Sequence, residues 1–125
     1  MERKAKENLE AAERLLAGPD PCPNAATSRS YYAAYQACWE LLGRKGVEPP
    51  EVRPAEVYFP HREMPDLALR KGVIDSQAAS GLRFLEGARV SADYDEAGSL
   101  DVATAEIAQR CARRIVELLG TGEGE

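Results

Sequence analysis

Apolar residues recur every three or four positions along most of the chain, and this spacing predicts helices. In residues 2–17 charged side chains surround one apolar stripe, made of Ala5, Leu9, Ala12 and Leu16. Prolines at 19, 21 and 23 end this helix, because proline cannot continue a helical hydrogen-bond ladder.

A second helix, over residues 25–43, has two adjoining apolar stripes. One stripe contains Thr27, Tyr31, Ala34, Cys38 and Leu41. The other contains Ser28, Tyr32, Tyr35, Trp39 and Leu42. A helix that is apolar around most of its circumference must be covered on several sides. We therefore expect it to be the central helix of the protein, or to meet a second subunit as well.

Glycines and prolines interrupt residues 43–65 and exclude a long helix there. Val57, Tyr58 and Phe59 form an apolar anchor within this loop, and a short helix is expected over residues 66–71. No segment alternates with a period of two for long enough to predict a strand.

The last two helices are expected over residues 75–92 and 100–119. Asp75 or Ser76 can cap the first of them, and Ser99 the second. The final helix has a predicted buried stripe at Leu100, Ala103, Ile107, Cys111, Ile115 and Leu118, and a predicted solvated face that includes Gln109. The fold class is therefore all-α: an antiparallel up-and-down bundle of four long helices plus one short helix, in one domain (residues 1–119) with a flexible tail (residues 120–125).

Composition narrows the possible functions. The net charge of −5 and the pI near 5.0 argue against broad, sequence-independent binding of nucleic-acid phosphates, although a local basic pocket is compatible with them. Cys22, Cys38 and Cys111 match no zinc or redox spacing, which favours free thiols in a reducing compartment. With no apolar leader and no run long enough to span a membrane, the chain is expected to be cytoplasmic, without a membrane partner.

Three features could carry chemistry. Tyr31, Tyr32 and Tyr35 could stack nucleobases, but aromatic residues on so apolar a helix more often pack in the core. His61 is the only histidine, and it could be a general acid or base, although a single loop histidine is more often solvated or structural. One histidine without clustered carboxylates predicts no metal site, and no cofactor motif occurs.

The third feature is Arg89, which lies beside the apolar stripe of its helix, one turn before Asp93 and next to Tyr94. A guanidinium in that position must be paired or must face a cleft. Two interpretations remain open: a structural Arg89–Asp93 pair, or an arginine that binds a phosphate or nucleotide.

The segments Ser30-Tyr-Tyr-Ala-Ala-Tyr35 and Arg89-Val-Ser-Ala-Asp-Tyr94 together resemble two signatures of the HEPN domain superfamily, and the order of the other helices is similar over nearly the whole chain. The resemblance implies a helical bundle, often a homodimer, and a minimal nucleotidyltransferase as partner in a toxin–antitoxin-type pair. It also implies metal-independent ribonuclease activity through an Arg followed by a His, as in many members of the superfamily, and silencing of some members when the partner transfers AMP to a tyrosine near that motif.

In this chain no histidine follows Arg89, so the expected ribonuclease motif is incomplete and enzyme activity stays undecided. The leading hypothesis is a nucleotide- or nucleotidyltransferase-binding partner. In it Arg89, Asp93, Tyr32 and Tyr35 form the nucleotide or phosphate site, Tyr94 is a candidate for modification, and no cofactor is needed. The alternatives are a ribonuclease toxin that uses Arg89 with Asp93 or His61, and a non-catalytic interaction domain.

Overall fold

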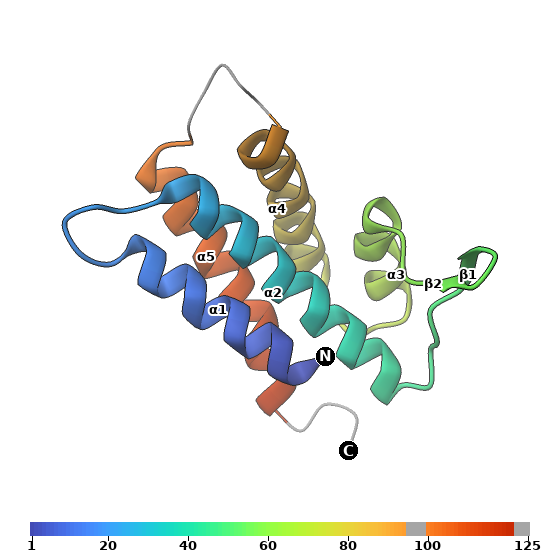
Figure 1. Cartoon of the computed structure of the whole chain (residues 1–125). Coiled ribbons are helices and arrows are strands. Elements are labelled where there is room, and N and C mark those ends of the chain that lie inside the picture. The colour runs from blue at the N-terminus through green and yellow to red at the C-terminus, as the bar shows by residue number, and fades with distance from the viewer. Residues whose placement is uncertain (95–99, 122–125) are drawn as a thin grey trace.

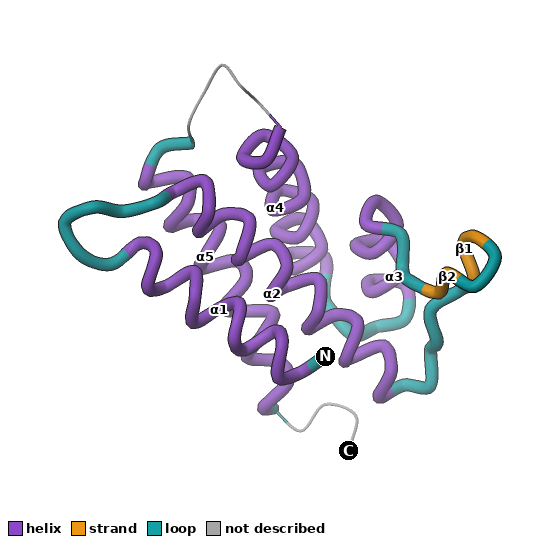
Figure 2. Tube along the Cα trace, in the orientation of Figure 1, coloured by secondary structure: helices purple, strands orange, loops and turns teal. Residues whose placement is uncertain are grey.

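The computed structural model describes residues 1–94 and 100–121. Within them it contains five α-helices: α1 (Glu2–Leu16), α2 (Pro23–Arg44), α3 (Met64–Arg70), α4 (Ser76–Tyr94) and α5 (Val102–Glu117). Figures 1 and 2 show the four long helices side by side. Helix α3 and a small hairpin lie to their right in this view. The predicted all-α bundle is confirmed. No helix among the described residues is long and apolar enough to cross a membrane.

Helix α2 occupies the centre of the bundle. It packs against α1, α4 and α5, and its buried side chains point in several directions around its axis. Tyr31, Leu41 and Leu42 are among the buried residues, and they come from both of the apolar stripes seen in the sequence. The wide apolar arc of α2 is thus covered within a single chain, as its central position requires.

The connection between α2 and α3 contains a small antiparallel hairpin that the sequence pattern did not predict. Its strands are β1 (Glu51–Arg53) and β2 (Glu56–Val57), and Ala55 makes the turn with a φ of +64°. Strands of three and two residues are too short to show an alternating pattern. Of the expected apolar anchor only Phe59 is buried, whereas Val57 is exposed.

Carboxylates cap the two C-terminal helices. Asp75 accepts a hydrogen bond from the backbone N–H of Ala78 at 2.8 Å, so the prediction of a cap at this position is confirmed. Asp101 caps α5 by accepting from the N–H of Thr104 at 2.8 Å. The cap predicted for α5, Ser99, lies outside the described residues.

The buried face of helix α5 agrees with the predicted stripe only in part. Ile115 is buried as predicted, but the face also carries Ala105, Ala108, Ala112 and Val116. Ile107, predicted to be buried, is exposed, and Gln109, predicted to be solvated, is buried and donates to Glu13 at 3.2 Å. Helix α5 packs against both α1 and α2, and the alanines fill part of that contact, where a pattern based on large apolar residues gives no signal.

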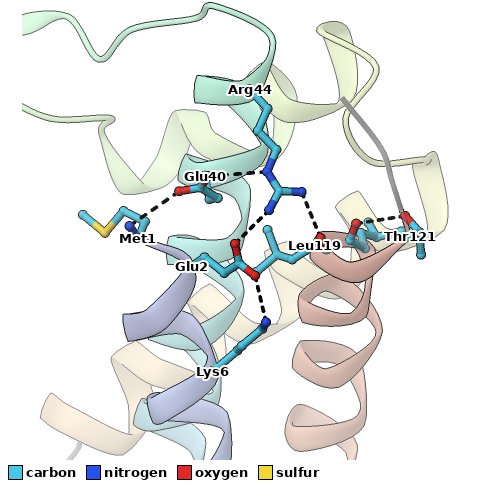
Figure 3. Close-up of polar contacts among 8 residues, drawn as sticks. Met1, Glu2, Lys6, Glu40, Arg44, Leu119 and Thr121 are labelled. Atoms are coloured by element: carbon cyan, nitrogen blue, oxygen red, sulfur yellow. Dashed lines mark hydrogen bonds and ion pairs between the residues drawn. The ribbon is translucent and has the colours of Figure 1, made fainter. Parts of the chain in front are cut away.

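Arg44, at the C-terminal end of α2, connects three segments of the chain (Figure 3). Its guanidinium donates to Glu2 of α1 at 3.0 Å, to Glu40 at 3.4 Å and to the carbonyl oxygen of Leu119 at 2.9 Å. Lys6 also donates to Glu2, at 2.8 Å. The Arg44 cluster, as we call these residues, thereby holds the ends of α1, α2 and the C-terminal 3-10 turn η2 (Leu118–Gly120) together.

Candidate functional site

Arg89 projects from α4 into the protein, and only 10% of its side chain is exposed. Its ion pair among the described residues is with Asp93, at 3.9 Å, which is too long for a hydrogen bond. Its Nε atom is buried and has no hydrogen-bond partner. The sequence placed this arginine beside the apolar stripe correctly, and burial makes the shortage of acceptors around it costly.

Two tyrosine rings of α2 lie under the guanidinium. The Arg89 Cζ atom is 5.1 Å from the centre of the Tyr31 ring and 5.9 Å from that of Tyr32. Such contacts attract the cation electrostatically, but they supply no acceptor for its N–H groups. Arg89 is therefore held in place by aromatic faces while its hydrogen-bonding capacity remains largely unused among the described residues.

His61, in the connection between α2 and α3, contacts the same tyrosines. It begins the 3-10 turn η1 (His61–Glu63), and its Nδ1 atom is hydrogen-bonded to the hydroxyl of Tyr31 at 2.5 Å. Its ring stacks on Tyr35, with centroids 4.4 Å apart and planes inclined by 29°. The Tyr35 hydroxyl donates to the carbonyl oxygen of Phe59 at 2.5 Å. These contacts hold the loop that contains His61 against helix α2.

The surroundings keep both ends of the Tyr31–His61 pair uncharged at neutral pH. Burial and, secondly, the Arg89 cation lower the pKa of His61 below its usual 6.5, and Glu86 opposes this only in part. Burial also raises the pKa of Tyr31, so the phenol stays protonated. Tyr35 behaves in the same way, because burial raises its pKa to about 12. The hydrogen bond occupies Nδ1 of His61 and leaves Nε2 for any further partner.

Asp93 links the C-terminal end of α4 to α2. Besides the contact with Arg89, it accepts a hydrogen bond from the Ser28 hydroxyl at 2.5 Å. The next residue, Tyr94, is 71% exposed and is the last residue of α4. Asp93 therefore orients the end of the helix while the adjacent phenol faces solvent.

The structure brings together side chains that lie far apart in the sequence. Arg89 and His61 both contact Tyr31, Tyr32 lies beside them, and Asp93 and Tyr94 follow at the end of α4. Tyr31 and Tyr35 are buried, as the core interpretation of these aromatics predicts, whereas Tyr32 is half-buried. We call the set Tyr31, Tyr32, His61, Arg89 and Asp93 the arginine–histidine site.

Sequence reasoning missed two members of this arrangement. The sequence marked Tyr31 as one of three tyrosines that could stack nucleobases but did not place it in the nucleotide or phosphate site, although it is the residue that both Arg89 and His61 contact. Ser28 gave no signal, because a serine near the start of a helix is common. Among the described residues, no three His, Cys, Asp or Glu side chains gather closely enough to hold a metal ion.

Chemically, the site offers a planar guanidinium, whose Nε has no hydrogen-bond partner among the described residues, and a neutral imidazole on one aromatic platform. A guanidinium is matched to the paired oxygens of a phosphate or carboxylate. Comparison with known protein families finds that the model of the HEPN domain matches residues 2–122. No curated protein matches the chain as a relative.

Proposed function

The chain belongs to the HEPN domain family, and from that premise we propose that it binds a phosphate-bearing nucleotide at Arg89, as the partner of a nucleotidyltransferase in a toxin–antitoxin-type module. One observation carries the proposal: a nine-tenths buried guanidinium has a single ion pair of 3.9 Å among the described residues and an Nε atom with no partner. A buried charge needs acceptors, and a phosphate would supply them.

The geometry of Arg89 and Asp93 supports binding of a ligand rather than a purely structural ion pair. In a structural pair we would expect short, bidentate hydrogen bonds between the guanidinium and the carboxylate. Asp93 instead turns one oxygen to Ser28 at 2.5 Å and keeps its distance from Arg89. Tyr32 lies under the Arg89 guanidinium, and Tyr35 stacks on His61 beside it. An incoming phosphate would then be held by Arg89, with Asp93 limiting how the guanidinium can turn.

Tyr94 is the candidate acceptor for modification by the partner. In such a step its phenolic oxygen forms a bond to the α-phosphorus of ATP, the bond to pyrophosphate breaks, and the phenol proton passes to a base. The partner enzyme would supply the ATP and the catalytic groups. The exposure of Tyr94 and its place five residues after Arg89 make it accessible beside a bound phosphate.

The test compares Arg89→Met with Arg113→Met, which removes an exposed arginine on α5 that pairs with Glu13 at 2.8 Å. Isothermal titration with AMP and with inorganic phosphate should show at least a tenfold loss of affinity, about 1.4 kcal/mol, in the first variant and none in the second. If both variants bind AMP like the wild type, or the wild type does not bind it, the proposal is wrong.

We also propose that two copies pair through the outer face of α4. Its exposed residues from 80 to 90 are Ser80, Arg83, Phe84, Gly87 and Val90. Arg83 is the one charged residue among these five, and it pairs with Asp66 at 2.5 Å. Phe84 and Val90 lie three residues on either side of Gly87, so two antiparallel copies crossing at Gly87 would place Phe84 of one against Val90 of the other.

Phe84→Glu should convert a dimer into a monomer, as measured by light scattering after gel filtration, because it places a charge in the apolar interface. Ile107→Glu is the matched control, since Ile107 is a similarly exposed apolar residue on α5. A wild-type monomer at high concentration, or dissociation by Ile107→Glu alone, would exclude pairing through this face.

A specific observation favours a second candidate function, metal-independent ribonuclease activity: His61 and Arg89 contact the same tyrosine. In this reaction His61 takes the proton of a 2′-hydroxyl, the 2′-oxygen attacks phosphorus, and the bond to the 5′-oxygen breaks. The products are a 2′,3′-cyclic phosphate and a 5′-hydroxyl that regains the proton. Cleavage of an RNA oligonucleotide in EDTA that is lost in His61→Gln would establish it, and absence of cleavage would reject it.

A further inference from the structure

A cleft of about 410 Å³ opens between the α2–α3 connection and helix α3. Figure 1 shows this part of the chain, with α3 and the hairpin to the right of the four long helices. The size falls within the roughly 300–1,000 Å³ typical of small-molecule sites. Its apolar lining includes Val47, Pro50, Phe59, Pro60 and Leu67. None of these residues was part of the site predicted from the sequence.

The walls of the cleft are held by hydrogen bonds and packing. Phe59 is only 1% exposed, its carbonyl oxygen accepts from Tyr35, and its ring meets that of Trp39 edge-on at 5.0 Å. The N–H of Val47 donates to the carbonyl of Leu42 at 2.9 Å, and that of Tyr58 to Pro50 at 3.2 Å. A preformed cavity of this kind binds without a large ordering cost.

The cleft adjoins the arginine–histidine site through the backbone. Pro60 and Arg62 line the cleft, and the residue between them, His61, is hydrogen-bonded to Tyr31, whose ring lies under Arg89. Consecutive Cα atoms are about 3.8 Å apart, so His61 lies at the edge of the cleft. A ligand with its phosphate near Arg89 could extend past His61 into the cleft.

The charges around the cleft favour a neutral group with polar edges. Five charged residues line it: Glu48, Arg62, Glu63, Asp66 and Arg70. Asp66 is paired with Arg83 at 2.5 Å. The other four form no ion pair with any described residue, and their two positive and two negative charges balance. A phosphate would meet carboxylates here, whereas the same carboxylates can accept from amino groups.

We infer that the cleft is the base subsite of the nucleotide whose phosphate binds Arg89, and that it takes a base bearing an exocyclic amino group, such as adenine. The inference rests on the proposed function for the phosphate end of the ligand. Proline and leucine side chains cover the faces of the base, Glu48 and Glu63 accept from its amino group, and Arg62 and Arg70 donate to its ring nitrogens.

The experiment titrates the protein with AMP, adenosine and inorganic phosphate. Leu67→Trp fills the cleft, and Leu69→Trp is the matched control, because Leu69 lies on the same helix, is half-buried and does not line the cleft. Wild-type protein should bind AMP at least tenfold more tightly than phosphate. Leu67→Trp should remove this advantage and leave phosphate affinity unchanged, whereas Leu69→Trp should alter neither.

The outcomes separate the two proposals. If adenosine binds and Leu67→Trp abolishes its binding while phosphate never binds, the proposed phosphate site is wrong and the base subsite stands. If phosphate binds but AMP gains nothing over it, or Leu67→Trp leaves the gain intact, the base subsite is wrong. Amide NMR needs no variant: adenosine should shift the signals of Val47, Phe59 and Leu67, and unchanged signals would overturn the inference.

Discussion

Arg44 and Arg89 are both shielded from solvent, yet their surroundings are opposite. The Arg44 side chain is 23% exposed and has acceptors from three segments, Glu2, Glu40 and the Leu119 carbonyl (Figure 3). Arg89 is 10% exposed and lies on aromatic rings, with its ion pair to Asp93 stretched to 3.9 Å. Within residues 1–94 and 100–121, the more deeply buried cation is the one with fewer acceptors.

This difference separates a stabilising arginine from one that is available for binding. A buried charge with satisfied donors holds elements together, and removing it leaves its acceptors unpaired. A buried charge with unused donors costs stability, and replacing it by an apolar side chain of similar size can be neutral or stabilising. The two arginines should therefore respond to the same substitution in opposite directions.

The largest expected change in stability is for Arg44→Met. It should lower the free energy of unfolding by about 2 kcal/mol, because three acceptors at the ends of α1, α2 and η2 lose their donor. Urea denaturation measures this, with Arg3→Met as control. The Arg3 side chain is 94% exposed, and its loss should change the stability by less than about 0.5 kcal/mol. Equal effects of the two substitutions would mean that the Arg44 cluster does not stabilise the fold.

Arg89→Met should leave the free energy of unfolding unchanged or raise it by up to about 1 kcal/mol, since methionine buries apolar surface over Tyr31 and Tyr32 and leaves no orphaned donor. The same denaturation experiment decides it. A loss comparable to that of Arg44→Met would show that Arg89 is structural and would remove the contrast between the two residues.

A smaller effect is expected from pH at His61. Its pKa in the folded protein lies below the usual 6.5, so the unfolded chain takes up a proton first as the pH falls. Stability should be constant above about pH 7 and should decrease as the pH falls through 6.5 toward the lowered pKa. His61→Gln should flatten this part of the profile in thermal denaturation. If stability instead rises as the pH falls through this range, burial of His61 beside Arg89 does not lower its pKa.

The smallest effect is expected at Glu2, in the Arg44 cluster. Lys6 first, and Arg44 to a lesser extent, lower the pKa of Glu2 below its usual 4.5. The folded state therefore keeps this carboxylate charged where the unfolded chain protonates, and the stability it gives is lost as the pH falls below about 4.5. Glu2→Gln should reduce the slope of the acid unfolding curve, whereas Glu10→Gln, on the exposed face of α1, should not.

Much of the fold follows from the sequence, because helical spacing records which face of a helix is buried. The stripes of α2 predicted a central helix, and Asp75 predicted the start of α4, as the structure has them. The face of α5 could not be read in this way. Half of its buried positions are alanines, and a pattern that selects large apolar residues chose Ile107, which is exposed.

The sequence by itself determined that the chain is a helical bundle, and it marked Arg89 by placing a guanidinium beside an apolar stripe. Only the tertiary structure decided what surrounds that guanidinium. His61 lies 28 positions earlier in the chain, in a loop without periodicity, and the contacts of Tyr31 and Tyr35 bring it to the same platform. Local spacing encodes which side of a helix is buried, whereas contacts between distant segments depend on how the helices pack.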